Sequence, residues 1–361
     1  MTTLSRILIT ISLVIGLTLS AFANASNRAL DVDLNVNHLD NGNVQAELTI
    51  TNSGKGVQKI LSWYTDLEEE NLFAITRDGQ AIQFMGPHYK RHAPTDKDFI
   101  MLKSGQSLSK TFELSGLYDF SQPGNYDVTY QVKSFDLFGR ATGKDKQAQR
   151  QVEQLKSNTV SLWFEGIAQK GSSNKGKPGG GGSTGDCIDG TCFTGRCDNS
   201  QKNDIMTALS AADQITNDSV SYLNTHSASN TSARYQTWFG AATSSRYNTV
   251  SANFNAINDA IDNQPLTFDC SCKKTYFAYV YPNQPYKVYL CRAFWSANVL
   301  GTDSRAGTIV HELSHFTAVA GTDDIVYGQS GAQSLANSNP DQAIENADSH
   351  EYFAENTPNQ N

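Results

Sequence analysis

The sequence predicts two domains: an all-β sandwich of the immunoglobulin-like kind, then a mainly helical α+β domain that contains a β-hairpin. Three observations predict this. Alternating apolar residues recur through the first half of the chain, helical apolar spacing fills the second half, and a stretch rich in Gly, Ser and Lys separates them. We therefore expect a leader at 1–25, a β domain at 26–169, a linker at 170–185 and a helical domain at 186–361.

The first 25 residues have the pattern of a secretory signal peptide. Arg6 precedes an apolar run at 7–19, and the small residues at 23–25 are what a signal peptidase reads. The run is shorter than the roughly 18 to 20 apolar residues needed to span a bilayer, which disfavours a membrane anchor. The sequence thus predicts a secreted protein that has no membrane span once the leader is removed.

Period-two alternation of apolar residues predicts the strands of the β domain. It occurs at 30–36 and 44–50, on either side of an Asp-Asn-Gly-Asn turn, which is typical of a β-hairpin. Short strands at such spacing indicate a sandwich, and roughly 140 residues suffice for a core. Further strands are predicted at 72–75, 82–85, 99–102, 126–132 and 160–164.

The linker joins charged and small residues to a run of four glycines. This composition cannot bury apolar surface, so we expect a flexible segment that proteases can reach. Two interpretations remain open: a plain connection between two retained domains, or a connector that is cut to release the second domain. A cleavable connector suits a precursor with an N-terminal propeptide.

Helical apolar spacing predicts helices at 205–223, 234–239 and 247–261, and Asn339-Pro340 opens a final helix. Tyr276–Tyr281 and Tyr286–Cys291 flank a four-residue turn and predict one hairpin. All six cysteines fall between Cys187 and Cys291, and an even number in an exported chain predicts three disulfides. Spacing alone leaves 15 pairings open, and a thiolate zinc site is the alternative.

The segment His-Glu-Leu-Ser-His at 311–315 carries the clearest chemical signal. On a helix, His311 and His315 lie one turn apart, so both imidazoles can reach one metal ion. Glu312 beside them leaves a carboxylate free to take a proton from water, which suits hydrolysis. Residues 302–304 offer N-caps for this helix, and Gly321 is a natural terminator.

Two histidines need a third protein ligand to hold a catalytic zinc ion. We choose Asp324, nine residues after His315, because the Gly-Thr turn between them can fold the chain back toward the helix. Tyr327 follows three residues later, where its phenol can face the oxyanion that forms when water attacks a peptide carbonyl. The alternative is that all of these residues are ordinary helix and turn residues with no metal-binding or catalytic role.

HExxH followed by Gly-Thr-x-Asp-x-x-Tyr-Gly resembles the aspzincin metalloendopeptidases, that is, deuterolysins and peptidyl-Lys metalloendopeptidases, from about residue 187 to the end of the chain. The resemblance implies one catalytic zinc ion held by His311, His315 and Asp324, with Glu312 as general base and Tyr327 as transition-state stabiliser. It also implies a zincin-like fold and a polypeptide substrate.

The resemblance further implies a disulfide pattern. It indicates one long-range bridge into Cys270 and a second bridge within the hairpin region. The implied pairs are Cys187–Cys192, Cys197–Cys270 and Cys272–Cys291.

The distribution of charged residues, and two acidic residues on one predicted helix, indicate which substrate the second domain prefers. Residues 1–175 carry 18 basic and 18 acidic residues, whereas 176–361 carry 10 and 18, so the acidic excess lies in the second domain and nucleic acid is an unfavourable partner. Asp348 and Glu351 lie three apart on one helix face. They resemble the acidic pair that lines the S1′ pocket in peptidyl-Lys members, which implies cleavage before lysine. A solvated surface helix is the alternative.

If cleavage before lysine holds, Lys170, Lys175 and Lys177 in the linker are candidate self-processing sites. The propeptide is then its own enzyme's inhibitor, and we place its blocking lysine within residues 89–92, with Lys90 as the candidate. His88 and His92 lie on either side of Lys90, two residues away, but this loop offers no third ligand for a metal site. We expect a monomer.

A secreted binding, adhesion or toxin protein with a degenerate peptidase domain is the alternative function. In that interpretation the β sandwich is the functional module.

Overall fold

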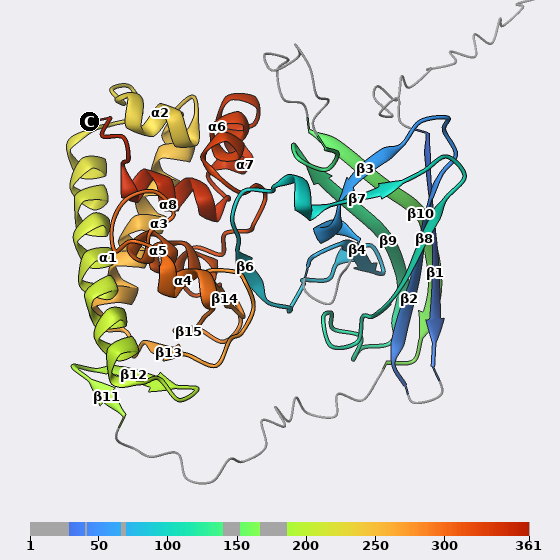
Figure 1. The fold of residues 1–361 in the computed structure, drawn as a ribbon, viewed down its shortest axis with the longest axis horizontal. Coiled ribbons are helices and arrows are strands. Elements are labelled where there is room, and N and C mark those ends of the chain that lie inside the picture. The colour runs from blue at the N-terminus through green and yellow to red at the C-terminus, as the bar shows by residue number, and fades with distance from the viewer. Residues whose placement is uncertain (1–28, 40–41, 66–69, 140–151, 167–185, 361) are drawn as a thin grey trace, which may run out of the picture.

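The computed structural model describes residues 29–39, 42–65, 70–139, 152–166 and 186–360. The predicted leader at 1–25 and the linker with Lys170, Lys175 and Lys177 lie outside these ranges. Figure 1 shows a sheet-rich N-terminal half and a mainly helical C-terminal half side by side. Within the described ranges, the structure contains no helix with the length and hydrophobicity to cross a membrane. The predicted domain boundaries stay predictions.

The N-terminal half, residues 29–166, is built from antiparallel sheets around one apolar core. Strands β1, β2 and β8 form one sheet, β10, β9, β4 and β5 form a second, and β3 pairs with β7. Its strands are β1 (Leu30–His38), β2 (Val44–Asn52), β3 (Gln58–Leu61), β4 (Phe73–Arg77), β5 (Gln80–Ala81), β6 (His88–Lys90), β7 (Phe99–Leu102), β8 (Ser107–Glu113), β9 (Gly124–Ser134) and β10 (Glu153–Phe164).

The predicted first hairpin is confirmed by the β1–β2 pairing. The predicted strand at 82–85 is wrong, because within it only Phe84 pairs, in an isolated bridge to Tyr118. Gly86 and Pro87 follow directly, and proline has no N–H to continue a ladder. The immunoglobulin-like topology stays a prediction.

The C-terminal half, residues 186–360, packs its helices and a small sheet around a second core. Its helices are α1 (Asn199–Thr225), α2 (Ala233–Phe239), α3 (Ser244–Asn263), α4 (Arg292–Ser296), α5 (Arg305–His315), α6 (Gln329–Ser338), α7 (Pro340–Ala343) and α8 (Ala347–Glu355). Its strands are β11 (Cys187–Ile188), β12 (Thr191–Thr194), β13 (Thr267–Asp269), β14 (Ala278–Val280) and β15 (Lys287–Leu290).

The predicted final helix is divided in two. The first piece, α7, begins at Pro340 as expected but ends at Ala343, and α8 begins after Asn346, which is extended (φ −92°, ψ 124°). Asn346 leaves the helix because its side-chain oxygen accepts hydrogen bonds from the backbone N–H groups of Ile325 and Val326, each at 3.1 Å. The hydrogen bonds made at this break therefore hold the loop that contains Asp324 in place.

A strand from the N-terminal half completes the sheet of the C-terminal half. The strand order is β11-β12-β13-β15-β14-β6, and β6 pairs antiparallel with β14, with Lys90 opposite Ala278 and His88 opposite Val280. Figure 1 shows β6 between the two halves, against the helical half. The edge of the predicted hairpin is thus occupied by the chain itself.

Three disulfides join Cys187 to Cys192, Cys197 to Cys270 and Cys272 to Cys291, the pairing that the resemblance implies. The second bridge spans 73 residues and ties the start of the helical half to its sheet.

Replacing both Cys197 and Cys270 with Ser is expected to destabilise the helical half by about 4 kcal/mol, since closing a long loop restricts the unfolded chain most. Replacing Cys187 and Cys192, which are five residues apart, is expected to cost only about 2 kcal/mol. Denaturant unfolding of both double variants tests this. An equal loss in the two would contradict the loop-length argument.

Candidate active site

Helix α5 presents the two histidines as predicted. Ser304 caps its first turn by accepting a hydrogen bond from the Gly307 N–H at 2.9 Å. His311 and His315 are buried one turn apart, and their Nε2 atoms lie 3.1 Å from each other. The helix ends at His315, so Gly321 is not its terminator, and that expectation is wrong. Gly321 instead supplies a turn residue with φ 60°.

The chain then folds back against α5. The Thr322 N–H donates to the Ser314 carbonyl at 3.1 Å, and the hydroxyls of the same two residues lie 2.6 Å apart. The Asp323 N–H donates to the Glu345 carbonyl at 2.8 Å, which ties the loop to the segment before α8. Together these bonds bring the Asp324 side chain to the two histidines, the fold-back that the Gly-Thr turn predicts.

His311, His315 and Asp324 converge on one point. Asp324 Oδ1 lies 3.1 Å from His311 Nε2 and 3.4 Å from His315 Nε2. Two ligand atoms of a tetrahedral zinc ion with bonds of about 2.0–2.1 Å lie about 3.3 Å apart, so these separations fit one ion. Within the described ranges this oxygen is buried and has no hydrogen-bond partner, as expected for an atom that is reserved for a metal.

The other ring nitrogens of the two histidines face acceptors. His315 Nδ1 lies 2.7 Å from the Thr322 carbonyl oxygen, which accepts the Nδ1 hydrogen and leaves Nε2 for the metal. His311 Nδ1 lies 3.0 Å from Asp348 Oδ1 and 3.2 Å from Glu351 Oε2. Both rings are therefore oriented with Nε2 toward the convergence point.

Glu312 is fully buried on the same helix and does not belong to the group of three converging atoms. Burial raises the pKa of its carboxyl to about 7. Its Oε1 accepts a hydrogen bond from the Lys90 backbone N–H at 3.3 Å. Its other oxygen, Oε2, has no hydrogen-bond partner among the described residues. This carboxylate can therefore exchange a proton with a group bound beside the metal position.

Lys90 reaches the predicted acidic pair on α8. Its Nζ lies 2.9 Å from Asp303, 3.2 Å from Asp348 and 2.7 Å from Glu351, and its side chain is fully buried. The centroid of the Tyr352 ring lies 5.2 Å from the Lys90 ammonium nitrogen. The Tyr352 hydroxyl donates a hydrogen bond to Asp303 Oδ1 at 2.8 Å. We call Asp303, Asp348 and Glu351 the lysine pocket.

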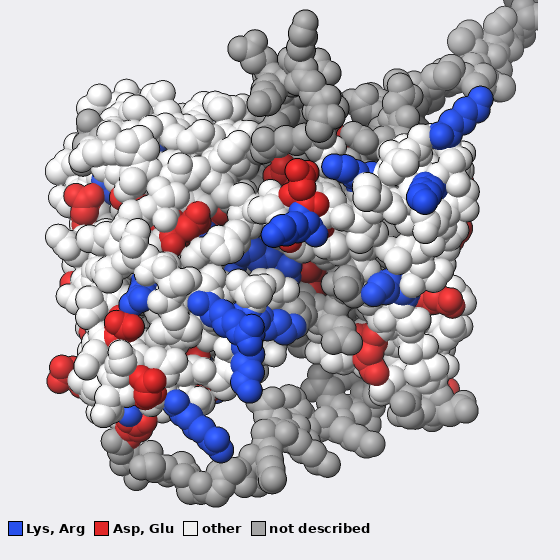
Figure 2. All heavy atoms as spheres, in the orientation of Figure 1, with Lys and Arg blue, Asp and Glu red and all other residues white. Residues whose placement is uncertain are grey.

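The carboxylates of the lysine pocket differ from the acidic residues on the surface. On the face drawn in Figure 2, the acidic side chains of the helical half are scattered among uncharged ones. In the pocket, Asp348 and Glu351 are fully buried, and they keep the pKa of Lys90 well above its usual value although burial opposes it. Sequence reasoning missed Asp303 and Tyr352 as pocket residues, because only folding brings them to Lys90.

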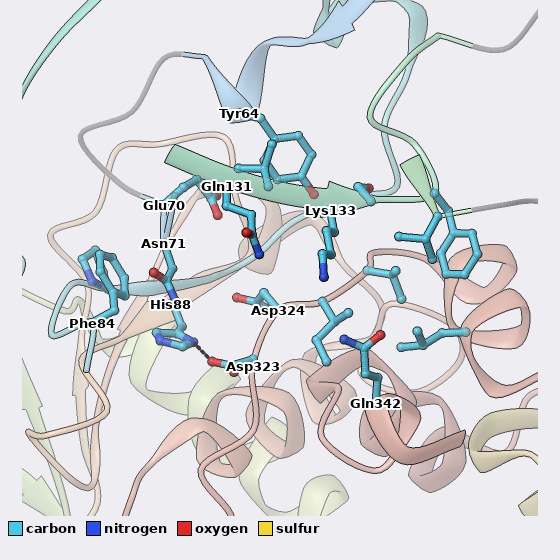
Figure 3. A pocket seen from close by; sticks show the side chains of 18 residues that line it. Tyr64, Glu70, Asn71, Phe84, His88, Gln131, Lys133, Asp323, Asp324 and Gln342 are labelled. Carbon is cyan, nitrogen blue, oxygen red and sulfur yellow. Dashed lines mark ion pairs between the residues drawn. The ribbon is translucent and has the colours of Figure 1, made fainter. Parts of the chain in front are cut away.

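Tyr327 is buried, and its hydroxyl has no hydrogen-bond partner among the described residues. Its ring packs edge-on against Trp63 of the N-terminal half, with ring centroids 5.4 Å apart. Both halves also contribute to an open pocket of about 290 Å³, which Asp324, Asp323 and Glu70 help to line. Figure 3 shows Asp324 facing this open pocket from the loop after α5.

Of the two histidines that flank Lys90, only His88 approaches the metal position. Its ring centroid lies 4.8 Å from that of His315, and its Nδ1 lies 3.8 Å from Asp323 Oδ1. The His92 ring instead packs at a tilt against Phe277, with ring centroids 4.2 Å apart.

Comparison with known proteins decides the family. A family model described as lysine-specific metallo-endopeptidase, of the aspzincin type, matches residues 224–355. An extracellular protease of Aeromonas hydrophila is 48% identical over 92% of this chain and 93% of its own length. The chain belongs to the aspzincin family.

A second relative supports the assignment, and one solved structure is similar to part of the chain. A peptidyl-Lys metalloendopeptidase of Grifola frondosa is 34% identical over 97% of this chain and 99% of its own length. A solved zinc peptidase from the same organism is 49% identical and covers 46% of this chain and 100% of the solved chain, with a TM-score of 0.44.

As an aspzincin, the protein is an extracellular zinc metalloendopeptidase that acts on polypeptides. The alternative of a binding or toxin protein with a degenerate peptidase domain is not favoured, since the chain is 48% identical to a protease over nearly its whole length.

Proposed function

We propose that this aspzincin is exported as a zymogen and cleaves peptide bonds on the N-terminal side of lysine. The observation that carries the proposal is the position of Lys90, whose ammonium contacts all three carboxylates of the lysine pocket. An extended ammonium chain among buried carboxylates is what an S1′ lysine requires, and no neutral side chain would offset these charges.

The backbone register supports the same assignment. Strand β6 adds to the sheet edge at β14, as extended peptides bind to many domains. The Lys90 N–H donates to Glu312 at 3.3 Å, so the peptide bond between Tyr89 and Lys90 lies at the general base. A substrate in this register would be cut directly before its lysine.

We assign the site residues roles from their contacts. His311, His315 and Asp324 would hold zinc, which supplies a Lewis acid that polarises a carbonyl and makes water more acidic. Glu312 takes the proton of the attacking water and returns it to the leaving amine, the atom that corresponds to the Lys90 nitrogen. Between these two proton transfers, Tyr327 donates its hydroxyl to the oxyanion that forms when water attacks the carbonyl, once the Trp63 ring no longer packs on it.

The N-terminal half is the inhibitor in this proposal. Besides Lys90, it inserts Arg91, which is buried, pairs with Glu70 of the same half, and lies 4.3 Å over the ring of Tyr276 in the helical half. These contacts keep β6 in place over Glu312. Cleavage before Lys170, Lys175 or Lys177 would then separate the two halves, and the enzyme's own preference for lysine makes self-processing the proposed route.

A peptide series tests the lysine preference. Three peptides that differ only in the residue after the scissile bond, Lys, Arg or norleucine, are given to the mature enzyme. The Lys peptide is expected to have a kcat/KM at least about 100-fold above the norleucine peptide, because norleucine leaves the buried carboxylates without a cation. Equal rates for Lys and norleucine would refute the assignment.

A further inference from the structure

The lysine pocket and the metal position share two oxygen atoms. Asp348 Oδ1 lies 3.2 Å from Lys90 Nζ and 3.0 Å from His311 Nδ1. Glu351 Oε2 lies 2.7 Å from Lys90 Nζ and 3.2 Å from His311 Nδ1. The same two atoms therefore face the substrate-like ammonium on one side and the metal-ligand ring on the other.

We propose that Asp348 and Glu351 are positioning residues for the metal ligand His311 as well as the lysine-recognition pair, so that zinc binding and lysine binding are energetically coupled. The inference rests on the proposed function, which makes His311 a zinc ligand and Lys90 a substrate mimic. It adds a second role for the pair and a link between the two sites.

The first step of the argument concerns the ring of His311. The Nδ1 atom of His311 makes no hydrogen bond among the described residues, but two carboxylate oxygens lie 3.0 and 3.2 Å from it. Negative charge at that distance favours the tautomer with a hydrogen on Nδ1 and a free Nε2, and it makes Nε2 a stronger metal ligand. The partners of His315 Nδ1 are uncharged: the Thr322 carbonyl oxygen lies 2.7 Å away and the Thr322 hydroxyl 3.5 Å away. The charged partners of His311 therefore make it the ligand whose strength depends most on surrounding side chains.

The second step concerns burial. Asp348, Glu351 and His311 are all fully buried, so their charges act on one another with little screening by water. Asp348 is itself fixed, because its Oδ2 accepts the Gly328 N–H at 2.6 Å. A carboxylate held in this way cannot turn toward the ammonium without changing its contact with His311.

The third step is the sign of the coupling. The Lys90 ammonium and the metal ion are both cations, and both are stabilised by the negative charge on the same two carboxylate oxygens. Each cation therefore weakens the binding of the other. Linkage is reciprocal: the factor by which Lys90 weakens zinc binding is the factor by which zinc weakens the hold on Lys90. Release of the propeptide strand is thus favoured once zinc is bound.

Zinc affinity of the full chain tests the proposal. All variants carry Glu312→Gln, which keeps the chain from cutting itself, and the zinc dissociation constant is measured by competition with a chromogenic chelator. Asp348→Asn and Glu351→Gln are each expected to raise the constant about 10- to 100-fold. Asp303→Asn is the matched control, because Asp303 contacts Lys90 at 2.9 Å but has no contact with His311 among the described residues.

Two further measurements keep the test decisive. Lys90→Met leaves both carboxylates in place and is expected to tighten zinc binding at least about fivefold. In cobalt-loaded protein, the visible spectrum is expected to shift in Asp348→Asn and Glu351→Gln but not in Asp303→Asn, whereas a general loss of structure would alter all three.

Unchanged zinc affinity in Asp348→Asn and Glu351→Gln would overturn the positioning role, and so would an equal loss in Asp303→Asn. Because none of these measurements requires catalysis, failure of the lysine preference in the peptide series would be seen separately.

Discussion

Replacing Glu312 with Gln is expected to lower kcat of the mature enzyme about 10²- to 10⁴-fold, with zinc still bound. The amide keeps the shape of the buried side chain and can stay beside the P1′ nitrogen, but it cannot take a proton from water and return it to the amine. Peptide cleavage is measured together with zinc content. The same substitution in the precursor is expected to leave the linker uncut.

The control for this substitution is Glu345→Gln, which removes an exposed carboxylate from the same half. It is expected to leave kcat unchanged. Activity retained in Glu312→Gln would show that another group is the base. Processing of the variant precursor at the wild-type position, identified by mass spectrometry of the new N-terminus, would show that a different protease matures the chain.

Replacing Lys90 with Met is expected to end the latency of the precursor. The comparison is made in a chain whose Lys170, Lys175 and Lys177 are changed to Gln, so that the linker offers no lysine. Removing one partner of a buried ion pair costs about 3–5 kcal/mol, which corresponds to a propeptide strand held roughly 10²- to 10⁴-fold less tightly. Cleavage of an added lysine peptide by the uncut precursor is the measurement.

Lys97→Met is the matched control, since Lys97 is an exposed lysine of the same half. It is expected to leave the precursor latent. If the Lys90→Met precursor is as latent as the control, then the pairing of β6 with β14 and the Arg91 contacts block the site without the lysine, and Lys90 is not the inhibitory residue.

Local sequence signals predicted much of helix α5 and of the turn that follows it. A cap at Ser304, histidines spaced by one turn and a Gly-Thr turn depend on interactions within about ten residues, and such interactions can be read from spacing. The break of the last helix was not predicted. Asn346 leaves the helix in order to bond Ile325 and Val326, some twenty residues earlier, and spacing along one segment does not contain that contact.

The sequence by itself determined the family motif, the position of α5, and the residue types that meet there. Only the tertiary structure decided what those residues face: Lys90 is brought to Asp348 across 258 positions and to Glu312 across 222. The shared oxygens between Lys90 and His311 arise in the same way. The reason is physical, because a helix fixes neighbours three or four residues apart, whereas a buried ion pair forms only when two cores pack and exclude water around it.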